Sequence, residues 1–287
     1  TWNGQAGSAW GQPLNWTPQR MPAGTDRILI ASGAADWPVL EESLELNILE
    51  IEPGASLDLA TYSLAVTNAL DSTNALVLAG TLTARGRQTI TARGNVKIAG
   101  GTFVPADSTF VLAKEGAMTA DLGNAAFNDL IVGKASGSVA FAGGFRAGAF
   151  TAEPQAAAAF SFAPGPVYEA DEWVLNGTTP GGTAGLVLAS AAPGQAWSLK
   201  ANALARVEGV AVSDSDASSG LAVVAGSPAE NGGNNTHWIF DVKTARWTGG
   251  AGTTDFAEPQ NWSGNARPDA QTRLMIDGSA KIDVAEA

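Results

Sequence analysis

The chain has 287 residues, 45% of them hydrophobic and 15% charged, so it is long enough to bury a core and too apolar to be intrinsically disordered. Its net charge of −12 excludes nucleic acid and anionic lipid surfaces as expected partners, because both would repel it. The absence of cysteine excludes disulfides and thiolate metal sites. No apolar run approaches the roughly 18 residues of a membrane-spanning helix, so we expect no membrane insertion.

A Trp-rich stretch opens the chain and returns near its end. Trp2 aligns with Trp247 (247−2 = 245), and Asn15 aligns with Asn261 (261−15 = 246), so the second copy carries one inserted residue. The aligned pairs beyond these are Trp10 with Phe256, Pro13 with Pro259, Trp16 with Trp262, Pro22 with Pro268, Arg27 with Arg273 and Ile30 with Ile276. We therefore predict one unit of a tandem array followed by the start of the next.

This alignment divides the chain into three parts. We predict a first Trp-rich segment at 1–35 that caps or joins units, a repetitive body at 36–240, and a second Trp-rich segment at 241–287 that begins the next repeat. Thr1 carries neither an initiator Met nor a charged signal sequence, so we expect a mature or excised piece.

Between the Trp-rich segments, short runs with alternating apolar residues dominate, and helical spacing is nearly missing. Small residues and turn formers separate the runs. The expected strands are 44–52, 55–70, 75–84, 88–104, 108–113, 128–133, 138–152, 185–190, 195–201 and 206–216.

The junctions between these strands favour a solenoid over a hairpin sandwich. Two-residue Asn-Gly and Asp-Gly hairpin turns are almost absent, whereas corners such as "AGG", "ARG" and "AGT" bend the chain without reversing it. We therefore predict an all-β fold, a right-handed parallel β-helix (β-solenoid) with Trp-rich capping or junction segments. At roughly 20 to 25 residues per rung, 36–240 would make about nine rungs. Their stack would be roughly 45 Å long.

A solenoid leaves an unpaired sheet edge at each end, which must be capped or joined to a neighbour. Aromatic residues recur at matching positions of both Trp-rich segments, as a packed junction requires, and Trp238 is placed to close the far end. The alternative for these aromatics is a sugar-stacking platform. The predicted assembly junction consists of Trp2, Trp10, Trp16, Trp238, Trp247, Phe256 and Trp262.

A candidate calcium loop lies in "DSDASSG" at 214–220. Asp214, Asp216 and Ser218 alternate as oxygen ligands at positions 1, 3 and 5 of such a loop do, but Ser219 occupies the position of the usual glycine. The simpler interpretation is an Asx-type turn, in which the carboxylates accept backbone N–H bonds. Any calcium here would be structural, and we expect no other cofactor.

Two further groups are candidates for catalysis. On a strand, Glu169 and Asp171 of "YEADEW" would share a face, with Glu172 opposite, so a glycosidase-like acid pair is conceivable. A solvated strand edge explains these carboxylates more simply. His237 is the only histidine, and we expect a packed or hydrogen-bonded turn residue because no nucleophile elbow accompanies it.

Four stretches carry a resemblance to a known class of proteins. They are "W-x-G…NW…P…I" at 2–30 and 247–276, "FNDLIVG" at 127–133, "PGQAWSL" at 193–199, and "VSDSDASSGLAVVAGSPAENGGNNTHWIF" at 212–240. Together they resemble repeat units of large secreted bacterial surface proteins with parallel β-helix architecture, similar to filamentous haemagglutinins and autotransporter passengers.

That resemblance implies a structural, extracellular role at the cell surface and no enzyme activity. We expect units that join end to end into a filament, fibre or stalk, with copies of themselves or neighbouring repeats as partners. The alternatives are a carbohydrate-binding or polysaccharide-degrading β-helix, with Trp173 or Trp197 near Glu169 and Asp171, and an adhesin that contacts surface glycans.

Overall fold

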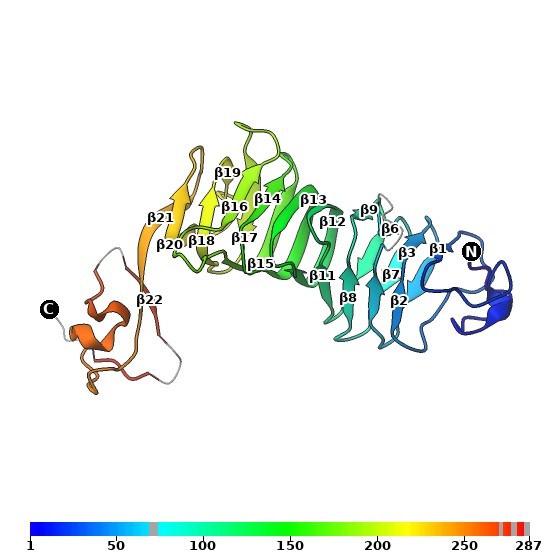
Figure 1. Ribbon diagram of the computed structural model, residues 1–287, viewed down its shortest axis with the longest axis horizontal. Coiled ribbons are helices and arrows are strands. Elements are labelled where there is room, and N and C mark those ends of the chain that lie inside the picture. The colour runs from blue at the N-terminus through cyan, green and yellow to red at the C-terminus, as the bar shows by residue number, and fades with distance from the viewer. Residues whose placement is uncertain (69–73, 270–271, 277–279, 284–287) are drawn as a thin grey trace.

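The computed structural model describes residues 1–68, 74–269, 272–276 and 280–283, and these form an elongated parallel β-solenoid (Figure 1). Stacked coils make about 10 turns, with 49% strand and 3% helix. The first Trp-rich segment lies at one end of the rod, and the second lies at the other. The predicted fold class, an all-β parallel solenoid, is confirmed.

The strands of the first half are short because each spans one side of a coil. Their bounds are β1 (Arg27–Ile30), β2 (Leu44–Leu46), β3 (Ile48–Ile51), β4 (Ser56–Asp58), β5 (Leu64–Val66), β6 (Leu76–Leu78), β7 (Thr81–Thr83), β8 (Thr89–Ala92), β9 (Val96–Ile98), β10 (Thr102–Val104) and β11 (Thr109–Leu112).

The second half has longer strands that bend around corners. Their bounds are β12 (Ala117–Val132), β13 (Gly137–Ala152), β14 (Ala158–Phe162), β15 (Val167–Asn176), β16 (Leu186–Ser190), β17 (Trp197–Ala201), β18 (Arg206–Val212), β19 (Ser215–Asp216), β20 (Val223–Asn231), β21 (Trp238–Arg246) and β22 (Thr272–Met275). The short 3₁₀ helices are η1 (Pro13–Asn15), η2 (Pro259–Asn261) and η3 (Ser263–Asn265).

Within the described residues, all pairings between these strands are parallel, as successive coils require. One face stacks β1, β3, β6, β9 and the first half of β12; a second stacks β2, β5, β8, β11 and the second half of β12. A third, shorter face stacks β4, β7 and β10. Partners are mostly 20 to 28 residues apart, for example Leu76 with Val96 and Phe160 with Leu188.

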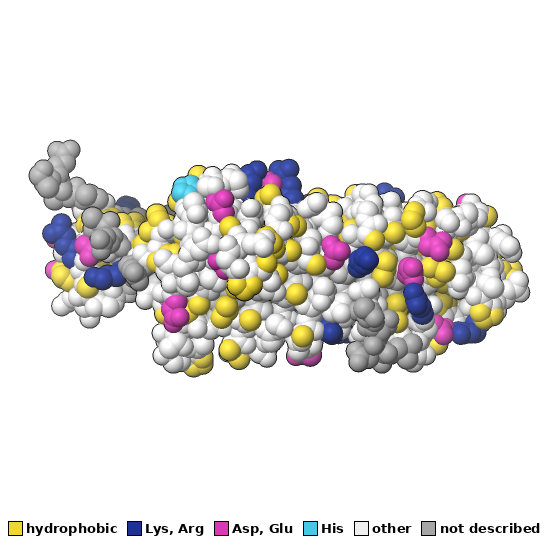
Figure 2. Space-filling model, turned by 90° about the horizontal axis from the view of Figure 1, so that it is seen from above, with side chains coloured by type: hydrophobic (Ala, Val, Ile, Leu, Met, Phe, Trp, Pro, Cys, Tyr) yellow, Lys and Arg dark blue, Asp and Glu magenta, His cyan; other side chains and the backbone are white. Residues whose placement is uncertain are grey.

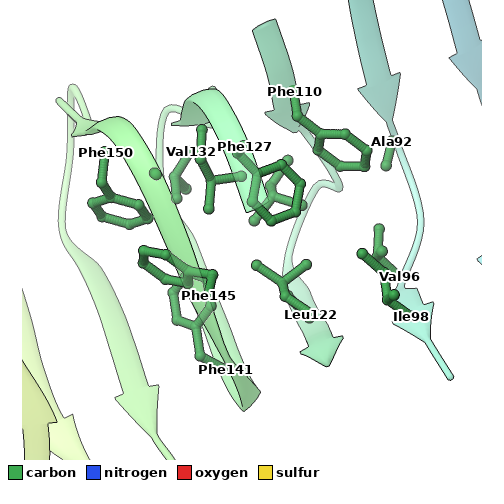
Figure 3. Close-up of a cluster of buried hydrophobic side chains, with 14 of the residues drawn as sticks. Ala92, Val96, Ile98, Phe110, Leu122, Phe127, Val132, Phe141, Phe145 and Phe150 are labelled. Carbon is green, nitrogen blue, oxygen red and sulfur yellow. The ribbon is translucent and has the colours of Figure 1, made fainter. Parts of the chain in front are cut away.

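The core consists of apolar columns that run along the rod, because in-register stacking places inward side chains directly above one another (Figure 3). One column is Leu64, Ile90, Phe110, Leu130, Phe150 and Trp173. Further along the rod the columns become aromatic. The rings of Phe141 and Phe162 stack with centroids 5.0 Å apart, and Trp197 stacks on Phe162 at 4.1 Å. Each coil thus buries its apolar face against its two neighbours.

Two strands lie at the predicted boundaries between the segments and the body. β1 lies in the first Trp-rich segment yet pairs with β3, so this segment contributes a full strand to the solenoid. β21 continues past residue 240 to Arg246, so the body ends inside the range assigned to the next repeat. In both cases the sheet continues across the composition change. The last two residues of the expected strand 55–70 lie outside the described residues.

The surface carries both charge signs close together. Lys and Arg side chains lie beside Asp and Glu side chains on the face shown in Figure 2 and do not form one basic patch there. Arg85 forms an ion pair with Asp58, and Lys200 forms one with Glu169 at 3.2 Å. In the described part of the chain, no helix has the length and apolarity to span a bilayer.

Candidate functional site: the two Trp-rich segments

Three indole rings form the centre of the first Trp-rich segment. Trp16 contacts Trp2 edge-on at a centroid distance of 5.0 Å and Trp10 at 4.7 Å. The Trp16 Nε1 donates to the backbone oxygen of Trp10 at 3.0 Å, so the cluster is oriented as well as apolar. All three side chains are at most 3% exposed.

A buried asparagine organises the loop around these rings. Asn15, at the end of η1, is 0% exposed; its Oδ1 accepts from the Ala6 N–H at 2.6 Å, and its Nδ2 donates to the Ala9 oxygen at 3.0 Å. The Gln12 side chain caps η1 through the Leu14 N–H. The amide therefore satisfies backbone groups that the loop would otherwise bury unpaired.

The second Trp-rich segment repeats the central contacts of this arrangement, and its asparagine makes two additional bonds to Thr253. Trp262 contacts Trp247 edge-on at 5.0 Å and Phe256 at 5.0 Å, and its Nε1 donates to the Phe256 oxygen at 2.8 Å. Asn261 is 0% exposed and pairs with Ala251 and Asp255 through the same two side-chain atoms. The sequence alignment is therefore a structural repeat as well.

The backbone connections of the two segments also match. The Trp2 N–H donates to the Leu29 oxygen in β1, and the Trp247 N–H donates to the Met275 oxygen in β22, both at 2.9 Å. Leu29 and Met275 differ by 275−29 = 246, the offset of the sequence repeat. Strand β22 is thus the second copy of β1.

The two copies differ in what covers them. In the first, the Trp2 Nε1 donates to the Asp36 oxygen at 2.7 Å, and the chain packs so closely that a Cβ on Gly4 would lie 2.2 Å from that oxygen. In the second, Trp247 and Phe256 remain half-buried. The later rungs of the solenoid provide the cover that the first segment has.

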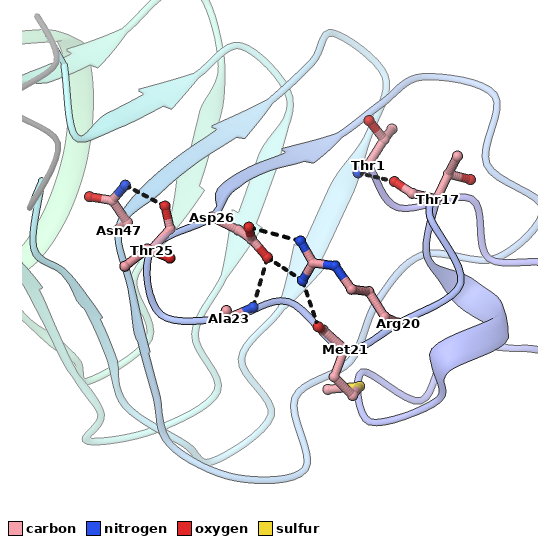
Figure 4. Close-up of polar contacts among 8 residues, drawn as sticks. All are labelled: Thr1, Thr17, Arg20, Met21, Ala23, Thr25, Asp26 and Asn47. Atoms are coloured by element: carbon pink, nitrogen blue, oxygen red, sulfur yellow. Dashed lines mark hydrogen bonds and ion pairs between the residues drawn. The ribbon is translucent and has the colours of Figure 1, made fainter.

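The outer edge of β1 lies beside a polar turn (Figure 4). Arg20 forms two bonds to the Asp26 carboxylate, at 2.7 and 3.0 Å, and the Ala23 N–H donates to the same group at 2.7 Å. The Arg20 bond, followed by the Ala23 bond, lowers the pKa of Asp26 to about 2. A hollow of about 160 Å³ lies between this turn, Thr1 and the first residues of β1.

Trp238 lies at the predicted far end of the body, on β21. Its Nε1 donates to the Ser215 Oγ at 3.0 Å, and its ring stacks on Phe240 at 5.9 Å. Both rings are partly buried against the core. Trp238 therefore packs the last rung of the body, close to the start of the second Trp-rich segment.

The three residues of the calcium candidate make hydrogen bonds of their own. Asp214 accepts from the Asn234 Nδ2 at 2.8 Å and from the Gly194 N–H at 3.1 Å. Both bonds lower the pKa of Asp214, and the bond from Asn234 has the larger effect. Asp216 accepts from the Ser218 N–H at 2.9 Å, and the Ser218 hydroxyl bond is the main cause of its lowered pKa. The Asp216 contact is of the Asx type, whereas Asp214 bonds to residues of neighbouring rungs. Among the described residues, no group of three or more His, Cys, Asp or Glu side chains is placed to hold a metal ion. Calcium binding stays a prediction.

The expectation for "YEADEW" was partly wrong. Burial alternates along β15 but breaks between Asp171 and Glu172, so Glu172 does not face opposite to Glu169 as predicted. The strand turns a corner there, and all three carboxylates lie outside the core. Glu169 accepts hydrogen bonds from Lys200 and Asn202, and Asn202 also donates to Asp171 at 2.8 Å. These contacts fit the simpler interpretation, a solvated strand.

Other candidates for sugar or catalytic chemistry have structural contacts. Trp173 is 1% and Trp197 0% exposed, so neither ring is available to stack on a sugar. His237 is exposed in a turn, with its Nδ1 3.2 Å from the Ala217 oxygen, which confirms the expected hydrogen-bonded turn residue.

Sequence reasoning missed the residues that connect the rungs at the two ends. These are Arg27, Ile28 and Leu29 on β1 and Lys243, Ala245 and Arg246 on β21. It also missed the buried role of Asn15 and Asn261, although their recurrence directly before a tryptophan in both segments was the available signal.

The fold and the repeated segments define a parallel β-solenoid with the same Trp-rich arrangement at each end. Comparisons with family models, curated proteins and solved structures gave no match.

Proposed function

We propose that this chain is a structural unit of an extracellular fibre or surface stalk in which solenoid units continue end to end. The observation that supports it best is the repeat of the first Trp-rich segment after the body, with the same central bonds and with β22 in the place of β1. β20 pairs with the first part of β21 and β22 pairs with its last part, so β21 joins the second segment to the end of the body.

The extracellular setting of this proposal comes from the sequence resemblance, and the mechanical role comes from the geometry. A rod of stacked coils has one direction in which it can grow, along its axis. Copies of the same unit or neighbouring repeats are the proposed partners. The adhesin alternative requires a receptor-binding face in addition, and the carbohydrate alternative loses Trp173 and Trp197 as stacking groups because both are buried.

A chain of two units tests this function. Residues 1–246 would be followed directly by residues 2–287, which places Trp2 where Trp247 stands. We expect one straight rod, longer than the single unit by about 50 Å for ten turns, by small-angle scattering and electron microscopy. The matched control carries a flexible Gly-Ser linker at the same point and should bend there. A direct fusion that hinges or folds back as the control does would overturn the proposal.

A further inference from the structure

Between β15 and β16 the chain makes an excursion from the solenoid. Residues 177–185, which we call the finger, lie at the corner between two faces of the coil. The same corner takes five residues, 153–157, on the preceding rung, and the single residue Gly209 on the next. The coil therefore closes without most of the finger, and the fold alone does not explain its length.

The base of the finger fits closely against the coil. The Gly185 N–H donates to the Gly177 oxygen at 2.8 Å, so the two ends of the finger meet. A Cβ on Gly209, whose φ is +65°, would lie 2.1 Å from the Thr178 nitrogen. Beyond this base, residues 180–183 are exposed. The sequence thus holds a hairpin at one place on the side of the rod and presents it to solvent.

The finger directly follows Asn176, which begins an Asn-Gly-Thr triplet. The side-chain amide of an Asn-x-Ser/Thr triplet is the acceptor of N-linked sugars. Four such triplets occur in the sequence, and they begin at Asn15, Asn176, Asn234 and Asn261. Burial closes two of them in the folded chain, because Asn15 and Asn261 are 0% exposed and their Nδ2 atoms donate to the loop backbone.

The two exposed triplets differ at the amide nitrogen that would carry the sugar. The Asn234 Nδ2 donates to the Asp214 carboxylate at 2.8 Å, so a charge-assisted bond would have to break first. Among the described residues, no group accepts a hydrogen bond from the Asn176 Nδ2, and the Asn176 Oδ1 accepts from the Thr178 N–H at 3.1 Å. This Asx turn holds the asparagine and threonine of the triplet in a compact bend and leaves the amide nitrogen accessible.

The surface beside Asn176 has room for a sugar. Asn176 lines a hollow of about 210 Å³ together with Val174, Arg206 and Glu208, and Met275 of β22 lines it as well. A guanidinium donates to sugar hydroxyls and a carboxylate accepts from them, while Val174 offers an apolar contact to a sugar ring. The first sugar of a glycan would therefore find hydrogen-bonding partners on the rod itself.

We propose that Asn176 is the N-glycosylation site that the fold leaves open. The donor is a polyprenyl-diphosphate oligosaccharide, and a transferase that recognises Asn-x-Ser/Thr performs the step. A bond forms between the Asn176 Nδ2 and C1 of the sugar, and the bond from C1 to the diphosphate oxygen breaks. The diphosphate leaves with the bonding electrons and takes the proton that Nδ2 loses. This modification is independent of the end-to-end function, because the site lies on the side of the rod.

Glycosylation of the folded full chain in vitro tests this site. The chain would be incubated with a polyprenyl-diphosphate oligosaccharide and a single-subunit oligosaccharyltransferase that requires only Asn-x-Ser/Thr, and the glycopeptides would be mapped by mass spectrometry. We expect occupancy at Asn176 at least about tenfold above that at Asn234, whose bond to the Asp214 carboxylate must break first. Unfolded peptides that carry the two triplets are the reference, and they should be modified to similar extents.

Two variants of the triplet separate specific transfer from unspecific attachment. Thr178→Ala keeps the Asn176 amide and removes the hydroxyl that the triplet requires, so it should abolish the modification. Thr178→Ser is the matched control, because it keeps a hydroxyl at this position, and it should retain the modification. Circular dichroism checks that both variants fold as the wild type does.

A folded chain that stays unmodified at Asn176, while the unfolded peptide with this triplet is modified, would overturn the proposal. Equal occupancy at Asn176 and Asn234 in the folded chain would do the same. Glycopeptide mapping of the protein from its natural source should find a sugar on Asn176, and a wholly unmodified Asn176 there would also overturn it.

Discussion

The two Trp-rich segments share their central bonds but have different surroundings. In both segments an indole N–H donates to a backbone oxygen, and an asparagine is completely buried. Only the first is covered by later rungs, so Trp2 is 1% exposed while Trp247 is half-buried. The loop conformation therefore follows from contacts within the segment, whereas burial of its apolar face depends on the rung that comes next.

The largest expected difference between the copies is at the first tryptophan. Trp2→Ala should lower the free energy of unfolding by about 3–5 kcal/mol, because it empties a fully buried site. Trp247→Ala should lower the free energy of unfolding clearly less, because the half-buried Trp247 side chain removes less apolar surface from water. Urea unfolding followed by far-UV circular dichroism measures both. Equal costs would mean that the cover over Trp2 contributes nothing.

The matched glycines sharpen the same contrast. Gly4 and Gly249 have φ of +64° and +63°, so alanine at either should cost about 1–2 kcal/mol for the left-handed conformation. Only at Gly4 would the Cβ meet the Asp36 backbone, which should add about 1–3 kcal/mol of overpacking. Unfolding free energies of Gly4→Ala and Gly249→Ala should therefore differ, and similar values would contradict the close packing at Asp36.

Substitution of the two buried asparagines should destabilise both segments, unlike the substitutions above. Asn15→Ala and Asn261→Ala each leave buried backbone groups unpaired, at a cost of about 1–3 kcal/mol. Both costs should fall in this range because both amides are 0% exposed and bond to the loop backbone. The two additional bonds of Asn261 to Thr253 place its cost at or above that of Asn15. Amide hydrogen exchange should show faster exchange at Ala6 and Ala251 respectively. A large effect at Asn15 alone would show that the second segment is not held by its own contacts.

The smallest expected effect concerns pH and belongs to the first copy alone. The pKa of Asp26 is lowered from 3.8 to about 2, so the unfolded chain takes up this proton first as pH falls. The stability from the Arg20 pair is therefore complete above about pH 4 and lost as pH falls toward 2. It should be small because the Arg20 side chain is 54% exposed, so solvent screens the pair.

Urea midpoints of the wild type and Asp26→Asn measure this effect. Their difference should shrink between about pH 4 and pH 2. The matching position in the second copy is Thr272, which has no carboxylate of its own. A gap between wild type and Asp26→Asn that stays constant over this range would contradict the role of the carboxylate.

The solenoid was predictable from the sequence because its physical basis is local. Inward residues alternate with outward ones along each strand, and small residues at the corners turn the chain without a hairpin. The column through Ile90, Phe110 and Phe150 follows directly from that pattern. The matching Trp-rich segments were predictable because Trp, Asn and Pro recur in them at an offset of 245 or 246 residues.

Features that depend on neighbouring rungs were not predictable. At Asp171 and Glu172 the alternation breaks because the strand bends, and the bend is set by the coil beside it. The continuation of β21 to Arg246 depends on β22, which lies 29 residues further along the chain (272−243 = 29). The outer edge of β1 is likewise visible only once its partner on the other side is known.

The direction of the strands has a mechanical consequence for the rod. Strands lie across the long axis, so tension applied at its ends separates neighbouring coils one at a time and does not shear a whole sheet. Each released coil of about 20 to 25 residues could lengthen from about 4.8 Å to roughly 70–85 Å. Without covalent cross-links, which the cysteine-free sequence rules out for disulfides, such a rod would yield stepwise and absorb work before it breaks.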